Sequence, residues 1–71
     1  MNSKTTINGH IVSHDESVNV GIRYLSHLLE EKESRVFFDQ AYSRGFAYFE
    51  DQMGYNYKLI HHGSEYQLVK A

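Results

Sequence analysis

The stretch Gly45–Lys70, GFAYFEDQMGYNYKLIHHGSEYQLVK, decides the fold of this chain. It contains three short runs of alternating apolar and polar residues, separated by two turn sequences that contain glycine. Runs of this length, bounded by turn residues, predict strands joined by hairpins. The pairing that each turn imposes then predicts which side chains share a face of the sheet.

The second turn sequence, His62-Gly63, sets the pairing of the last two strands. Glycine accepts a positive φ, so an X-Gly pair suits a two-residue hairpin loop. Closing the hairpin there pairs Leu59 with Tyr66 and Tyr57 with Leu68.

The first turn sequence, Asp51-Gln52-Met53-Gly54, has the chemistry of a type I turn followed by a left-handed glycine. Closing a four-residue loop there pairs Glu50 with Tyr55 and Tyr48 with Tyr57. The two hairpins together predict one apolar face that packs under the helices. Its expected members are Phe46, Tyr48, Tyr57, Leu59, Tyr66 and Leu68.

The opposite face of the predicted sheet is mixed, as expected for a half-solvated antiparallel sheet. It would carry Ala47, Phe49, Asn56, Lys58, Ile60, Glu65, Gln67 and Val69. Its apolar members are either scattered surface hydrophobes or part of a contact surface, because contiguous exposed apolar residues often mark contact sites. The second interpretation gives these candidate protein-binding residues: Phe49, Ile60, Val69, Tyr55 and Phe38.

The N-terminal segment combines β-branched residues with a strong hairpin dipeptide. Asn8-Gly9 separates Thr5–Ile7 from His10–Val12, after an end at Met1–Lys4 that we expect to fray. Either a small hairpin packs on the body, or one arm joins the sheet as a fourth strand. We favour the second arrangement, since an isolated hairpin this short is not stable.

Two helices are expected between these strands. A capping box at Ser13–Glu16 precedes apolar residues at helical spacing, and predicts a helix over residues 14–32. Gly21 inside this helix is expected to mark a close approach to the sheet. A second helix is expected over residues 35–44, with Ser34 as its cap and Gly45 as its left-handed stop.

The second helix carries three consecutive apolar residues, Val36, Phe37 and Phe38, so one of them is expected to point to solvent or to a partner. The predicted fold is therefore a small single α+β domain spanning residues 1–71. Its order is β–α–α–β–β–β, with a three- to four-stranded antiparallel sheet covered on one face by two helices.

Composition limits the function classes worth considering. Seven Lys and Arg against nine Asp and Glu give a net charge of −2, which argues against a general nucleic-acid binder. The chain has no cysteine, no apolar run long enough to span a membrane and no signal-peptide pattern, so we expect a cytoplasmic protein without membrane contact.

No pattern predicts a catalytic, cofactor or metal site. Five histidines occur, but none forms an H-x-x-x-H pair on a helix, and there is no cysteine to complete a metal site. The adjacent carboxylates Glu50-Asp51 lie at a turn, where aspartate is favoured because its side chain forms a hydrogen bond with the backbone. An enzyme is therefore not expected.

The order β–α–α–β–β–β resembles that of RelE/ParE-type toxins of toxin–antitoxin pairs. The resemblance implies an RNA-directed or gyrase-directed protein, which here would use Arg35, Arg44, Lys58 and tyrosines. The function that we expect instead is a non-enzymatic protein-binding or regulatory module. It would act through a sheet face or a homodimer contact, as an accessory or inhibitor protein of a phage or mobile element.

Overall fold

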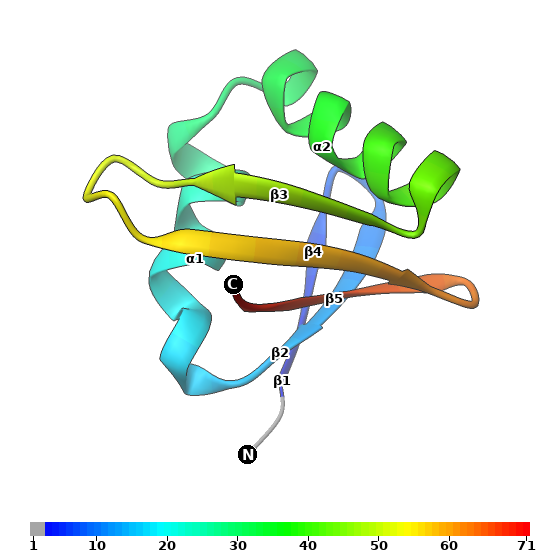
Figure 1. The fold of residues 1–71 in the computed structure, drawn as a ribbon, viewed down its shortest axis with the longest axis horizontal. Coiled ribbons are helices and arrows are strands. Elements are labelled where there is room, and N and C mark those ends of the chain that lie inside the picture. The colour runs from blue at the N-terminus through cyan, green and yellow to red at the C-terminus, as the bar shows by residue number, and fades with distance from the viewer. Residues whose placement is uncertain (1–2) are drawn as a thin grey trace.

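A five-stranded sheet with helical segments against one face forms the body of the protein, in a computed structural model that describes residues 3–71 (Figure 1). In chain order the elements are β1 (Ser3–Ile7), β2 (His10–His14), the 3-10 turn η1 (Glu16–Val18), α1 (Asn19–Arg23), the π-helical turn η2 (Tyr24–Leu28), α2 (Glu31–Arg44), β3 (Phe46–Glu50), β4 (Asn56–His62) and β5 (Glu65–Lys70).

The predicted α+β class is confirmed, but the sheet has five strands rather than three or four. Its order is β1-β2-β5-β4-β3, and the β2–β5 pair is parallel, so the sheet is mixed rather than purely antiparallel. In Figure 1 the hairpin of β1 and β2 passes behind β4 and β5, so the sheet bends around its own core.

The N-terminal hairpin forms, and it also joins the sheet. Asn8 and Gly9 both have positive φ (52° and 82°), as a type I′ turn requires. The hairpin is not left isolated, because β2 pairs with β5 through Val12–Tyr66 and Ser13–Gln67. Of the end expected to fray, Ser3 and Lys4 belong to β1, and residues 1–2 lie outside the described residues.

The β4–β5 hairpin closes one residue later than the sequence suggested. Gly63 and Ser64 form the loop, and His62 pairs with Glu65. Gly63 has φ 64° and Ser64 does not have a positive φ, which fits a type II′ turn. Because the pairing moves by two residues, the side chains keep their faces, and Leu59 lies opposite Leu68 on the buried side.

The β3–β4 hairpin differs by one residue, and this exchanges the two faces of β3. The Asp51 N–H donates to the Tyr55 carbonyl at 3.0 Å, and Gly54 has φ 88°. The loop is thus a type I turn with a left-handed glycine and one extra residue, the geometry of a G1 bulge. The prediction for β3 was therefore wrong: Ala47 and Phe49 are buried, whereas Phe46 and Tyr48 are exposed.

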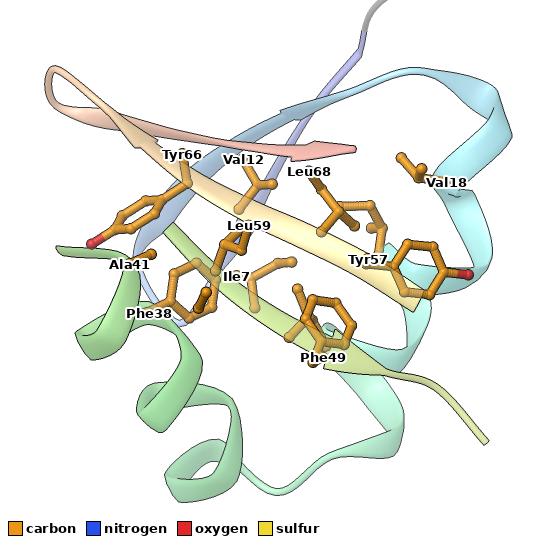
Figure 2. Packing of buried hydrophobic residues seen from close by; sticks show 13 residues of the cluster. Ile7, Val12, Val18, Phe38, Ala41, Phe49, Tyr57, Leu59, Tyr66 and Leu68 are labelled. Atoms are coloured by element: carbon orange, nitrogen blue, oxygen red, sulfur yellow. The ribbon is translucent and has the colours of Figure 1, made fainter. Parts of the chain in front are cut away.

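The core is a cluster of apolar side chains from the inner face of the sheet and from the helical segments (Figure 2). Of the apolar residues at helical spacing, Val18, Ile22 and Leu25 are buried, whereas Leu29 is half-buried and Leu28, expected to widen the same stripe, is exposed. The buried cluster consists of Ile7, Val12, Val18, Ile22, Leu25, Phe38, Ala41, Ala47, Phe49, Tyr57, Leu59, Tyr66 and Leu68.

The first predicted helix is shorter and less regular than expected. Strand β2 extends through His14, so Asp15 caps the helical segment instead of Ser13, accepting a hydrogen bond from the Ser17 N–H. The segment passes from 3-10 to α to π geometry and ends where Leu29 turns extended. A helix over residues 14–32 is therefore wrong in its bounds.

Helix α2 begins at Glu31, so Ser34 lies inside it rather than at its cap. The Ser34 hydroxyl is buried and donates to the Leu25 carbonyl at 2.5 Å, which joins α2 to the π-helical turn. Gly45 ends α2 in the left-handed conformation (φ 92°), as predicted. Among the three consecutive apolar residues Val36 is the one that points to solvent, with 52% of its surface exposed.

Gly21 brings α1 directly against the sheet. A Cβ atom at this position would lie 2.8 Å from Cε1 and 2.9 Å from Cζ of Tyr57. Such distances are shorter than van der Waals contact, so the helix can approach β4 this closely only with glycine here. The predicted close approach is confirmed.

Replacing Gly21 with alanine tests this contact. Alanine favours the helix by about 1 kcal/mol, whereas overpacking a core costs about 1–3 kcal/mol. Since the clash is with a buried ring, we expect Gly21→Ala to lower the free energy of unfolding by about 1 kcal/mol. Urea unfolding followed by circular dichroism measures the difference. Arg23→Ala, an exposed position in the same helix, is the control, and a variant as stable as wild type would contradict the contact.

Candidate protein-binding surface

The helical segments all pack on one side of the β3–β5 part of the sheet. Gly21 lies against Tyr57, and the ring centroids of Phe37 and Phe49 are 5.2 Å apart. In Figure 1, α1 lies behind β3 and β4, and the front face of these strands is uncovered. Side chains alternate along a strand, so residues adjacent to the buried ones point to this open face.

Five side chains meet on the open face, and we call them the outer-face cluster: Phe46, Tyr48, Lys58, Ile60 and Val69. Phe46 lies opposite Ile60 across the β3–β4 ladder, and Tyr48 lies opposite Lys58. Lys58 in turn lies opposite Val69 on β5. Exposed fractions of 40% for Phe46 and 56% for Tyr48 make the cluster an accessible apolar surface.

Lys58 occupies the centre of this cluster. Its Nζ lies 5.2 Å from the ring centroid of Phe46 and 5.6 Å from that of Tyr48, within the range of cation–π attraction. The two rings pack edge to face at 5.4 Å. Within residues 3–71 the ion pairs are Lys4–Glu65 and Glu31–Arg35, so no carboxylate neutralises the Lys58 ammonium.

The structure separates the five residues predicted to bind a partner. Ile60 and Val69 lie half-buried on the open face, in the outer-face cluster. Tyr55 is exposed, but it lines a separate hollow beside Val20 on the helical side. Phe49 and Phe38 are buried in the core, so the expectation that they lie on an accessible surface was wrong.

Phe49 and Phe38 are buried for local reasons. Phe49 turns inward because the extra residue in the β3–β4 loop shifts the register by one. Phe38 faces the sheet because α2 presents Phe38 and Ala41 to the core, where Phe38 contacts Tyr66 edge to face with centroids 4.9 Å apart. The same shift brings Phe46 and Tyr48 to the open face, and the signal that could have indicated it is the left-handed glycine of the Asp51–Gly54 turn.

Asp51, one of the two adjacent carboxylates, organises that turn. Its Oδ1 accepts hydrogen bonds from the N–H groups of Met53 (2.8 Å) and Tyr55 (3.0 Å), and its Oδ2 accepts one from the Tyr57 hydroxyl (2.8 Å). The predicted turn role is confirmed. Glu50 instead points to the open face and is exposed.

These contacts change the proton affinity of both partners. Burial alone would raise the pKa of Asp51, but the hydrogen bonds from Tyr57 and from the turn N–H groups outweigh it and hold this pKa below its usual value. Burial, together with the nearby Asp51 carboxylate, raises the pKa of Tyr57 to about 12. Tyr57 therefore stays protonated and donates to Asp51 across the neutral pH range.

Three of the five histidines have packing partners in the structure. His10 stacks on Phe38 with centroids 4.6 Å apart, and His61 lies 5.1 Å from Tyr66. His14 is buried, with Nε2 2.9 Å from the Thr5 hydroxyl. Within residues 3–71, no three His, Asp or Glu side chains gather in a way that could hold a metal ion.

Across the same described residues, every helix is too short or too polar to cross a lipid bilayer.

No protein-family model, curated protein or solved structure matches this chain. From β2 onward the order is strand, two helical segments and three strands, with β1 added before it. The resemblance to RelE/ParE-type toxins rests on this order alone.

Replacing Asp51 with asparagine tests its role in the turn. A carboxylate whose pKa is lowered by folding stabilises the protein above its unfolded pKa, about 3.9, and this contribution is lost as the pH falls through the folded value. At pH 7 we therefore expect a lower urea midpoint for Asp51→Asn than for wild type. The difference between the two midpoints should become smaller below about pH 3.9.

Circular dichroism at pH 7 and pH 3 measures both midpoints. Tyr57→Phe keeps the carboxylate and its two backbone partners, so it serves as the milder control. If the midpoints of wild type and Asp51→Asn differed by the same amount at both pH values, the Asp51 charge would not contribute to stability.

Proposed function

We propose that this protein is a non-enzymatic binding module that contacts another protein through the open face of β3–β5. The observation that carries the proposal is the outer-face cluster, in which aromatic and aliphatic side chains surround a lysine on a face without helical cover. Contiguous exposed apolar surface of this kind is typical of contact sites.

The cluster suits binding because its side chains are held in place before a partner arrives. Ile60 and Val69 are β-branched and lose little rotamer freedom on contact. Phe46 and Tyr48 are held edge to face, 5.4 Å apart. Aromatic residues at the centre of a contact often supply most of its binding energy.

Site-specific photo-crosslinking tests the proposal. A benzophenone amino acid placed at Tyr48 is expected to form adducts of defined mass when the protein is expressed in the cells that encode it. The matched control is the same amino acid at Tyr42, which is 69% exposed on α2 and lies outside the cluster. Absence of adducts at Tyr48, or the same adducts from both positions, would refute the proposal.

A further inference from the structure

We infer that the partner presents a carboxylate surrounded by apolar side chains, and that this carboxylate pairs with Lys58. The inference rests on the proposed function, because it names the chemistry of the partner at the same surface. It follows from the position of one charge within the outer-face cluster.

Lys58 lies where a partner would exclude water. Tyr48 flanks it on β3 and Val69 flanks it on β5, and its ammonium group lies over the ring of Phe46. A partner that covers these apolar groups must also cover the ammonium group. An unpaired charge taken out of water is costly, whereas a hydrogen-bonded ion pair offsets much of that cost.

The ammonium group is available for such a pair. No carboxylate of residues 3–71 lies within 4 Å of it, whereas Lys4 on the edge strand β1 does pair with Glu65. The ammonium group lies closer to the ring of Phe46 than to that of Tyr48. Along β3, Phe46 is farther from Glu50 than Tyr48 is, so the ammonium group is directed away from that carboxylate. The Lys58 ammonium group can therefore form an ion pair with a carboxylate of a partner protein without first breaking an ion pair within this chain.

A second copy of this chain fits the open face poorly. In a symmetric face-to-face dimer the same surface meets itself, so residues at the centre meet their own copies. Lys58 is at the centre of the apolar residues, and overlap of the two clusters would bring two ammonium groups together. Like charges in that position oppose binding.

A nucleic acid is also disfavoured, although exposed rings on a sheet can stack on bases. Affinity for nucleic acid depends on several cations that neutralise phosphates. Here Lys58 is the one lysine of the cluster, Glu50 and Glu65 lie on the same face, and the chain carries a net charge of −2. One isolated cation within apolar surface matches one carboxylate of a protein.

Selection from a random 12-residue peptide library displayed on phage tests this inference. Wild type is expected to enrich peptides with Asp or Glu beside aromatic or aliphatic residues, and Lys58→Glu is expected to lose them. Lys32→Glu, an exposed charge reversal on α2, is the control and should select the same peptides as wild type. For a selected synthetic peptide we expect Lys58→Glu to raise the dissociation constant at least tenfold.

Several outcomes would overturn the inference. Enriched peptides without a carboxylate, acidic peptides that bind Lys58→Glu equally well, or no enrichment at all would each contradict it. Lys58-dependent binding of a 12-nucleotide uridine RNA would assign the lysine to phosphate instead. Tyr48→Ser separates the two proposals: peptides that need Tyr48 but not Lys58 leave the proposed function intact, and peptides that need neither count against both.

Discussion

The Asp51 carboxylate fixes which face of β3 is buried. It accepts hydrogen bonds from two N–H groups of its own turn and from the Tyr57 hydroxyl, and it thereby holds a loop with one residue more than a four-residue turn. Compared with a four-residue loop, this extra residue shifts the pairing of β3 with β4 by one residue along the whole ladder. A shift by one exchanges the faces of a strand, so this single loop decides that Phe49 packs inside and Tyr48 points outward.

Tyr57 links this turn to the rest of a small core. Its hydroxyl donates to Asp51, and its ring fills the space that a Cβ atom at Gly21 of α1 would need. The buried Ser34 hydroxyl joins α2 to the carbonyl of Leu25 at the π-helical turn. A chain of this size buries only about 60% of its unfolded surface, so each such contact is a large part of what orders the fold.

Local patterns predicted the class, the hairpins and most of the core, and physical reasons explain the rest. The β4–β5 pairing was wrong by two residues, which left Leu59 and Leu68 on the predicted face. The β3–β4 pairing was wrong by one, which moved Phe46 to the opposite face. The parallel contact of Val12 with Tyr66 joins segments more than 50 residues apart, and no local pattern encodes it. Ile60 was predicted at the candidate surface, whereas Lys58 was assigned to that face but not to the site.

Cross-strand nuclear Overhauser effects test the register most directly. The hydrogen bonds Asp51 N–H to Tyr55 O and His61 N–H to Gly45 O make the odd-numbered residues of β3 the hydrogen-bonded ones, so Tyr48 and Lys58 form a non-hydrogen-bonded pair with close α-protons. We expect a strong Hα–Hα effect between Tyr48 and Lys58. An effect between the α-protons of Phe49 and Asn56 instead would indicate the four-residue loop, which would place Tyr48 in the core and remove the open surface.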